Sequence, residues 1–518
     1  MSRAKLPLFS PLDLSTEEYT NADQGDISKR TSLQLYNVFL NKNGFAEMRP
    51  TFNVSSNYSN SSFALGDVRV HGAFYWAEKQ REYDIGGTKL YAPKNAFDVL
   101  LDTASTGELV ATTRPIFTTF KYPTGGTWPG SKGTGSDVMA IAGGGKIMLF
   151  DGTSSTYANP TGAPTNVTHV GYADGHLVCN EVGQQRLWWS DVLDPFTFNA
   201  LNFAEAEGIP DDVTALHVMR NQVYLFGTRS IEIFYNDGTG FIPAKGQAVN
   251  MGCYAPYTIK EYNNSFIFLN DKAEVVIMSG GQIDVISKPI EELISLISDK
   301  ASMFGMLLTW QGRYYYILQT PEKGTGELDG FTLVYDLENG SWYQWSIYRD
   351  DAHYEMPVYS TTEINPTLPT GYSGFDYIRF GSDHGWAGYV NFATSDGTDA
   401  YIDDEGSLQS ASTYIQTTSP YISHGTQGRK ISRALRFKLK GGLTKADVKV
   451  QYKDDISGDW STARTVVVYN LARDLIQWIQ TQSYQWGSYR NRQWRIIIDE
   501  PRGMCVGDFE EVFEVVEE

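Results

Sequence analysis

Four segments in the middle of the chain share one pattern of hydrophobic and polar positions, in which two apolar runs flank a two-residue polar or glycine turn. The turns fall at Asp174-Gly175, Arg220-Asn221, Asn263-Asn264 and Gln311-Gly312, and successive turns are 46, 43 and 48 residues apart. After the second and third hairpins, a short polar turn leads into another apolar run, "IEIFY" or "VVIM". Each unit is therefore expected to be a small antiparallel meander. A meander that repeats at about this spacing is typical of a β-propeller.

Weaker copies of the pattern flank the four segments, near Val68, Asp137 and Phe375. Together they predict a propeller of six blades, with seven as the alternative, over residues 61–404. The pair Trp188-Trp189 stands where the next strand of the first meander is expected. Because neighbours on a strand point to opposite faces, we expect one tryptophan to pack between blades and the other to be exposed. The second tryptophan ring then either has a structural role or stacks on a ligand.

One helix is predicted between two blades. In "SKPIEELISLISDK", residues 287–300, Ile290, Leu293, Ile294 and Ile297 follow one another at helical spacing. Pro289 stands near the start, where proline is tolerated. We expect an amphipathic helix of about three turns that lies on the propeller.

The pattern changes after about residue 400. In "ALRFKLKGG", residues 434–442, apolar positions alternate with arginine and lysine, and "ADVKVQYKDD" and "QWRIIIDE" also alternate. Such alternation is typical of an antiparallel sheet with one solvated face. We expect an all-β chain in which a C-terminal antiparallel β-sandwich, residues 405–518, follows the propeller. Residues 1–60 are polar with scattered prolines, and we expect an arm or an irregular entry segment there.

The composition agrees with a β-rich globular protein. Of 518 residues, 41% are hydrophobic and 14% aromatic, and 49 are glycine. The three cysteines stand far apart, so neither a disulfide framework nor a Cys-x-x-Cys zinc pair is expected. The first 20 residues lack the apolar core of a secretion signal, and no apolar run is long enough to span a membrane. We therefore expect folding in a reducing cytoplasm.

Signatures of catalysis are scarce. The seven histidines show no helical metal-binding spacing, and no G-x-S-x-G motif occurs. The stretch "GGTWPGSK", residues 125–132, has serine and lysine in the wrong order for a phosphate-binding loop. Dense acidic groups such as "IDDEG" and "YKDDISGDW" are expected by chance in turns of a chain with 61 acidic residues. We expect no enzymatic activity, no catalytic or metal-binding residues and no cofactor.

One segment differs sharply in charge from the rest. The chain has a net charge of −19, which disfavours coating of DNA, whereas residues 427–453 hold nine basic residues and one acidic residue, a net +8. Such a segment is either the solvated face of the sheet or a docking surface for an acidic neighbour. Its first four cations, Arg429, Lys430, Arg433 and Arg436, are the candidate partner-binding residues.

Several stretches in order resemble the packaged-DNA stabilisation proteins of short-tailed phages, the podoviruses. They are the segment from "RLWWSDVLDPFTFNALNFAEAEG" to "IEIFYNDG", then "GCYAPYTI", "VISKPIEELISLISDK", "GSWYQW", "RKISRALRFKLKGG" and "YQWGSYRNRQWRIII". The resemblance runs over residues 135–505. It implies a structural virion protein of the tail hub, or nozzle.

The resemblance also implies partners and a place of action. Such proteins form a hexameric ring below the portal and adaptor, and the ring extends the DNA channel and retains packaged DNA until ejection. A needle or plug and tail fibres or spikes are further partners, and genomic DNA passes without sequence-specific contact. The protein would be made in the host cytoplasm and act in the virion. The alternative is a glycan-binding or glycan-hydrolysing, sialidase-like tail propeller.

Overall fold

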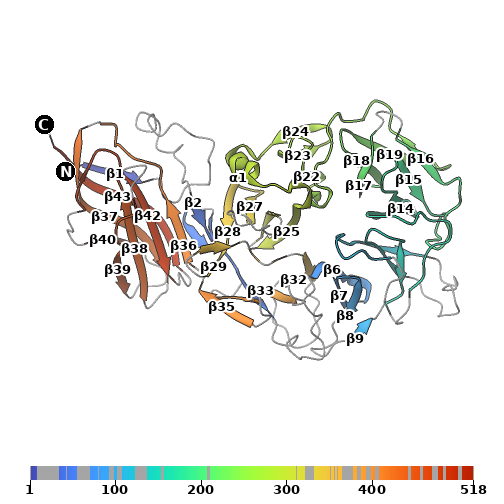
Figure 1. Ribbon diagram of the computed structural model, residues 1–518, viewed down its shortest axis with the longest axis horizontal. Helices are drawn as coiled ribbons and strands as arrows, with labels where there is room; N and C mark the ends of the chain where they lie inside the picture. The colour runs from blue at the N-terminus through green and yellow to red at the C-terminus, as the bar shows by residue number, and fades with distance from the viewer. Residues whose placement is uncertain are drawn as a thin grey trace.

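The computed structural model describes most of the chain as strands and turns. The described residues are 2–6, 8, 34–41, 44–54, 70–79, 81–92, 99–101, 108–122, 137–152, 157–206, 211–310, 312–320, 332–349, 352–354, 356, 358, 360–364, 377–381, 387–391, 398–402, 408–412, 414–426, 428–441, 445–454, 459–469, 476–481, 486–499 and 504–516. A ring of small sheets is joined on one side to an elongated body that holds both chain ends (Figure 1). None of the described helices is long and apolar enough to cross a membrane.

Within the described residues, five sheets of the ring are separate four-stranded antiparallel blades. Their strands, in order within each sheet, are β6 (Val70–Trp76), β7 (Arg81–Gly86), β8 (Lys89–Ala92) and β9 (Val99–Leu101); β13 (Val170–Ala173), β14 (His176–Asn180), β15 (Arg186–Trp189) and β16 (Phe203–Glu205); β17 (Val213–Met219), β18 (Gln222–Gly227), β19 (Ile231–Asn236) and β20 (Phe241–Pro243); β21 (Lys260–Tyr262), β22 (Ser265–Leu269), β23 (Val275–Ser279) and β24 (Gln282–Val285); and β31 (Ser360–Ile364), β32 (Tyr377–Gly381), β33 (Ala387–Asn391) and β5 (Thr51–Val54). The all-β fold and the propeller are confirmed. Five separate blades are found in the described part of the chain, which corrects the expected six or seven.

Two further sheets stand in the ring but depart from the four-stranded pattern. One has three strands, and the other is the first part of a nine-stranded sheet. Their strands are β10 (Ile116–Lys121), β11 (Asp137–Ala142) and β12 (Met148–Phe150), and β25 (Phe304–Trp310), β26 (Arg313–Gln319), β27 (Thr332–Asp336) and β28 (Ser341–Trp345). The meander β25–β28 is not a separate blade, because its last strand, β28, also pairs with β2 (Gln34–Tyr36) and so is not an edge strand.

The hairpin turns explain why the chain forms these meanders. A two-residue turn of type I′ matches strand twist but requires positive φ at both residues, which asparagine, aspartate and glycine tolerate best. Positive φ is found at both residues of three predicted turns, at 45° and 82° for Asp174-Gly175, 52° and 60° for Arg220-Asn221, and 46° and 59° for Asn263-Asn264. Gly312 of the fourth turn also has positive φ, 72°, and Gln311 lies outside the described residues.

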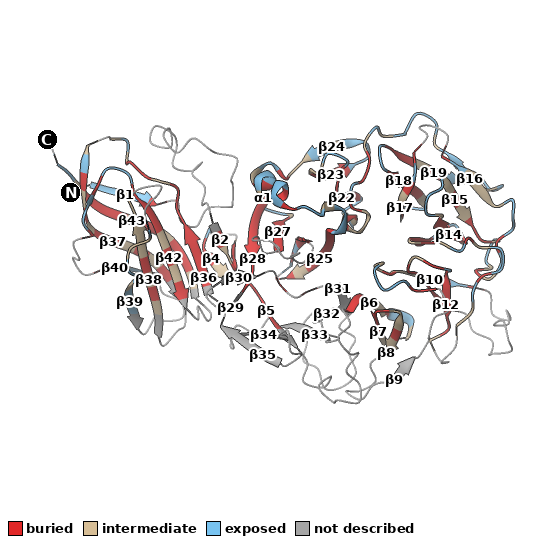
Figure 2. Cartoon of the chain, viewed as in Figure 1, coloured by how far each residue is buried: buried red, intermediate tan, exposed pale blue. Residues whose placement is uncertain are grey.

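Buried apolar side chains fill the spaces between neighbouring blades, and Figure 2 colours many residues of the blade strands as buried. Trp189 packs with Leu216 and Phe234 of the next blade, so the prediction that one tryptophan lies between blades is confirmed. Trp188 is half-buried rather than exposed, and its Nε1 donates a hydrogen bond of 2.9 Å to Oε2 of Glu181.

The expected helix is present but shorter than predicted. A 3₁₀ turn, η5 (Lys288–Ile290), leads into the α-helix α1 (Glu291–Leu296), and Ile297 already has extended backbone, with φ −78° and ψ 121°. Ile290 and Ile294 are buried in one core with Trp342. The apolar positions are thus divided between η5, which holds Ile290, and α1, which holds Ile294. A second 3₁₀ turn, η6 (Lys300–Ser302), follows.

The described residues of the N-terminal segment are strands in both parts of the molecule. β5 pairs with β33 and completes a blade whose other strands lie more than 300 residues later. β2 lies between β28, to which it is parallel, and β36 (Tyr414–Thr418), to which it is antiparallel. β1 (Ser2–Leu6) and β4 (Ala46–Met48) pair with the C-terminal strand β43 (Met504–Val516), and β3 (Val38–Leu40) pairs with β4.

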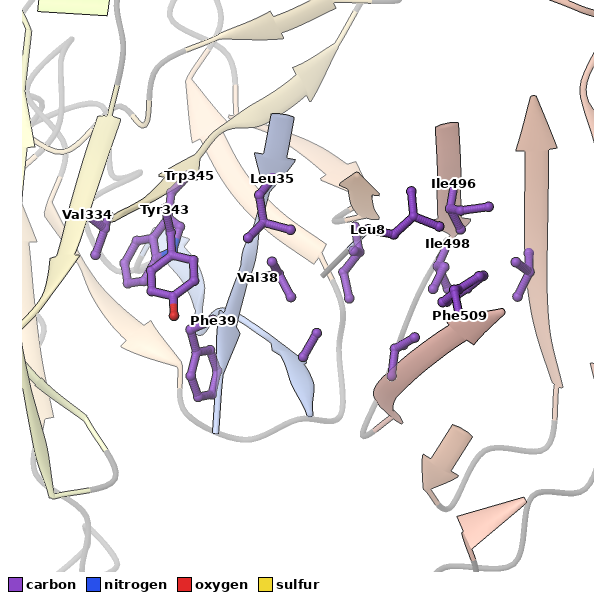
Figure 3. Packing of buried hydrophobic residues seen from close by; sticks show 14 of the residues in the cluster. Leu8, Leu35, Val38, Phe39, Val334, Tyr343, Trp345, Ile496, Ile498 and Phe509 are labelled. Carbon is purple, nitrogen blue, oxygen red and sulfur yellow. The ribbon is translucent and has the colours of Figure 1, made fainter. Parts of the chain in front are cut away.

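The elongated body consists of two sheets around one core. The strands after residue 405 that build them are β36, β37 (Arg429–Gly441), β38 (Lys445–Lys453), β39 (Arg464–Tyr469), β40 (Ile476–Gln480), β41 (Ser488–Tyr489), β42 (Gln493–Asp499) and β43. Two small hairpins lie beside the blades, β29 (Ile347–Arg349) with β30 (Ala352–Tyr354) and β34 (Thr398–Ile402) with β35 (Leu408–Ser412). Figure 3 shows the core running from Tyr343 of a blade past Leu35 to Ile498 and Phe509 of the body. A β-sandwich that begins at 405, and the boundaries at 60 and 404, stay predictions.

Candidate functional site at the centre of the propeller

A pocket of about 740 Å³ lies at the centre of the ring. Seven sheets contribute to its wall, through β6, β10, β13, β17, β21, β25 and β31, and Tyr314 of β26 also lines it. Each of these seven strands is the first strand of its meander, including β10 of the three-stranded sheet. The repeat that the sequence reveals therefore places one short segment of every sheet around a shared opening.

Basic groups from different strands meet in this pocket. His71 comes from β6, His217 from β17 and Lys260 from β21, while Arg114 stands just before β10. Among the described residues of the wall, Glu261 carries the one carboxylate. Burial and the neighbouring Arg114 lower the pKa of Lys260 to about 8. The pocket is thus a place where positive charge is concentrated in an acidic protein.

Two histidines beside the lysine are held neutral. Burial, and then the charge of Lys260, lowers the pKa of His169 to about 3. Burial also lowers the pKa of His217 well below its usual value, with His169 and Lys260 adding to the effect. The ring of His169 stacks on Tyr257 with centroids 5.5 Å apart and lies 5.8 Å from the ring of His217. Both imidazoles are therefore neutral; His217 lines the pocket, and His169 is buried beside it.

One polar atom of this cluster lacks a partner. Nδ1 of His169 lies 3.0 Å from the hydroxyl oxygen of Thr168, while Nε2 is buried and has no hydrogen-bond partner among the described residues. The guanidinium carbon of Arg114 lies 3.2 Å from the ring centre of Phe304, a cation–π contact. No group of three or more histidine, cysteine or carboxylate side chains within the described ranges is placed to hold a metal ion.

The sequence reasoning missed this pocket because each histidine alone is most often a structural residue. One signal was present in the repeat. His217 stands four residues before the second turn residue Asn221, and Lys260 stands four residues before Asn264. The two side chains therefore occupy equivalent places on neighbouring inner strands, as their registers opposite Tyr224 and Ile267 show.

The four predicted partner-binding residues lie on β37, far from this pocket in the elongated body. Arg429 is exposed, whereas Lys430 is fully buried and its Nζ donates to the carbonyl oxygens of Thr426 at 2.7 Å and Gly428 at 3.1 Å.

The other two predicted residues pair with the C-terminal strand β43. Nε and Nη2 of Arg433 donate to Oε2 of Glu514 at 3.1 and 2.8 Å, and Nη1 of Arg436 donates to Oε2 of Glu510 at 2.9 Å. Much of the basic charge thus already faces carboxylates of its own chain. A role of the four residues in binding a partner stays a prediction.

The comparisons with known proteins concern the propeller. The family model described as "Bacteriophage P22 Gp10, beta-propeller" matches residues 125–360, which span β11 to the first residue of β31. No curated protein matches the chain in sequence.

Solved structures give only distant similarity. The extracellular domain of the hybrid two component system BT4673 from B. thetaiotaomicron matches 71% of this chain at 10% identity, with a TM-score of 0.40. The chain spans 45% of that structure, so less than half of its length. An exo-beta-1,3-galactanase from Phanerochaete chrysosporium, matched over 72% of this chain and 93% of its own, has 10% identity and a TM-score of 0.25. Scores this low support no conclusion about function.

The family match covers the same meanders that the hairpin spacing revealed, and the matched description names the same architecture. Through residues 125–360, the chain matches the packaged-DNA stabilisation family of bacteriophage proteins, and this match supports a phage structural protein with a β-propeller.

Proposed function

We propose that the protein is the tail hub, or nozzle, of a short-tailed phage. In this proposal, six copies form a ring below the portal and adaptor, extend the DNA channel and retain packaged DNA until ejection. The family match over residues 125–360 is the observation that carries the proposal. The protein would be made and assembled in the host cytoplasm and would act in the tail of the virion.

The charge of the chain supports a role beside DNA. At a net charge of −19, the protein repels phosphates, so DNA can pass along it without sticking. Contacts with DNA in this role are not sequence-specific. The needle or plug and the fibres or spikes would bind other faces of the ring.

The loop between β15 and β16 is a candidate contact surface between copies. It exposes 64% of Val192, 47% of Leu193 and 82% of Leu201, which are large apolar side chains. Apolar groups that gather on a surface often mark a protein–protein contact. The aromatic stretch "RLWW" forms β15, a strand of one blade, and this loop begins directly after it.

The test is the mass of the assembled species. Native mass spectrometry of the purified protein, alone and with its adaptor, should show a six-fold species. The variant Leu201→Asp should weaken that assembly and leave the monomer folded. Leu296→Asp is the matched control, because Leu296 is also exposed, at 47%, but lies on α1 in another part of the ring.

Two outcomes would contradict the proposal. One is a protein that stays monomeric with the adaptor present at micromolar concentration. The other is release of reducing ends from host polysaccharide in a reaction that depends on a carboxylate, which would favour the glycan-acting alternative.

A further inference from the structure

We propose that the apolar loop between β15 and β16 of one copy docks on the exposed side of β40 in the body of the next copy. The contact joins two patches, which we name the loop patch (Val192, Leu193 and Leu201) and the body patch (Ile476 and Trp478). This inference rests on the proposed assembly of copies into a ring. It adds the surface that receives the loop, which belongs to a second copy of this chain.

The first argument is the symmetry of a closed ring. When one contact repeats around a ring of six copies, it is head-to-tail, so each copy needs two different patches that fit each other. The described residues offer one patch on the propeller and another on the body. The strands that carry them lie at opposite ends of the molecule, β15 and β16 at one end and β39 and β40 at the other (Figure 1). One copy can therefore contact a neighbour at each end.

The loop patch is held in place by hydrogen bonds within its own blade. Leu193 has φ 56°, a left-handed conformation that is unfavourable for leucine, and its amide donates to the carbonyl oxygen of Gly175 at 2.7 Å. The amide of Leu201 donates to Oδ1 of Asn199 at 3.1 Å. Backbone strain of this kind is concentrated in functional segments. Because the loop is already ordered, docking loses less conformational entropy than it would if a flexible loop had to be fixed.

The body patch is an apolar and aromatic surface at the side of a sheet. β40 is the last strand in the order of its sheet among the described strands, and Ile476 and Trp478 are 49% and 41% exposed. The guanidinium carbon of Arg436 lies 4.8 Å from the ring centre of Trp478. Tryptophan and arginine are enriched among the residues that dominate protein–protein binding. The patch therefore has the composition of a contact surface.

The charges beside the two patches are complementary. The loop, residues 190–202, contains two aspartates and no basic residue. On the body, Lys438 stands opposite Trp478 in the sheet register, so the two side chains lie on the same face. Nζ of Lys438 lies 3.9 Å from a carboxylate oxygen of Asp508, which also binds Nζ of Lys5 at 2.7 Å. Two lysines thus share this carboxylate, and the positive charge that remains favours the approach of an acidic loop.

The first experiment links the two patches covalently and leaves their apolar side chains in place. Ala200→Cys and Gln480→Cys change exposed residues beside the loop patch and the body patch. The double variant is assembled and oxidised with copper phenanthroline, which forms disulfides between thiols that lie close together. We expect covalent multimers of up to six copies from the double variant and none from either single variant. The wild type controls for Cys505, which is partly exposed in every copy.

The second experiment measures the contribution of the body patch. Trp478→Ala should raise the subunit concentration needed for half-assembly about tenfold or more, because a large aromatic contact is lost. Tyr254→Ala is the matched control, because Tyr254 is also an exposed aromatic residue, at 46%, but lies on the propeller outside both patches. Native mass spectrometry over a dilution series measures assembly. An unchanged melting temperature shows that each variant is folded.

The inference is overturned if the double cysteine variant forms no more covalent multimers than the single variants. It is also overturned if Trp478→Ala and Tyr254→Ala assemble alike. In either case, a six-fold species that still depends on Leu201 would leave the proposed ring intact and assign the loop to another surface. A protein that stays monomeric with its adaptor present contradicts the ring and this contact together, so the measured mass separates the two failures.

Discussion

The carboxylate of Asp211 should contribute more to stability than any other single hydrogen-bonding group in its blade. It lies just before β17 and binds the short turn between β18 and β19. Its Oδ1 accepts from the amide of Thr228 at 2.9 Å and from the hydroxyl of the same residue. Its Oδ2 accepts from the amides of Arg229 at 2.6 Å and Ser230 at 2.9 Å. One side chain thus satisfies three consecutive backbone donors.

The cost of changing this carboxylate to an amide follows from these contacts. In Asp211→Asn, one side-chain oxygen still accepts hydrogen bonds, but the other is replaced by an NH₂ group. That NH₂ group faces backbone N–H groups of the turn, which are also donors. A hydrogen bond to a charged group contributes about 1.5–3 kcal/mol, and a buried donor left unpaired costs a similar amount. Since such contributions are not additive, we expect the free energy of unfolding to fall by about 2–4 kcal/mol.

The effect should also depend on pH. Burial acts to raise the pKa of Asp211, but the hydrogen bonds from Thr228, Arg229 and Ser230 outweigh it, and the pKa lies below the usual 3.8. The folded state therefore binds the proton less tightly than the unfolded state. The contribution to stability is complete above pH 3.8 and is lost as the pH falls through the lower, folded pKa.

Urea unfolding followed by tryptophan fluorescence is a suitable assay, because Trp189 packs in the same core as Val213 of β17. Hydrogen exchange of the peptide that contains residues 228–230 gives a local reading. Asp212→Asn is the control, since Asp212 is exposed and the net charge changes equally. If the two variants unfold at the same urea concentration, the reasoning about the turn is wrong.

The remaining predictions concern other contacts. Arg49→Leu removes the donors to Oδ1 of Asn37 at 2.7 Å and to the carbonyl of Ser346 at 2.8 Å, and urea unfolding should show a loss of about 3 kcal/mol. Gly252→Ala places a methyl group against the carbonyl of Thr228, and calorimetry should show a melting temperature lower by several degrees, with about 1–3 kcal/mol lost. Arg429→Glu, which changes an exposed cation, should weaken assembly in sedimentation at low salt and leave the melting temperature unchanged.

The parts of the fold that depend on local sequence could be predicted. The type I′ turns need only two residues that accept positive φ between apolar runs, and both conditions are visible in the sequence. The position of α1 was likewise visible from the spacing of Ile290 and Ile294. Its length was not, because Ile297 continues the apolar spacing while its backbone is extended. Apolar spacing shows which side chains face the core and does not fix the backbone between them.

The pairings between distant segments could not be predicted. β2 is three residues long, so it carries too few positions to show alternation, and its partners β28 and β36 lie about 300 and 380 residues away. The basic segment was visible, but charge alone cannot tell a partner in another molecule from one in the same chain. Arg433 and Arg436 face Glu514 and Glu510 of β43, a strand that carries four acidic residues and no basic one.

The same distant pairings determine how the two parts of the molecule are connected. A domain that follows a propeller through a single linker can rotate against it, whereas here β2 joins a blade and the body into one hydrogen-bonded sheet. The buried group of Arg49, Asn37 and Ser346 lies at this junction and ties the N-terminal strands to the end of β28. Rotation of the body would break backbone hydrogen bonds and expose a continuous core. A surface on the propeller and a surface on the body are therefore held at a fixed distance and angle. A subunit of the proposed ring would need this property if its neighbours contacted one part of the molecule and its other partners contacted the other part.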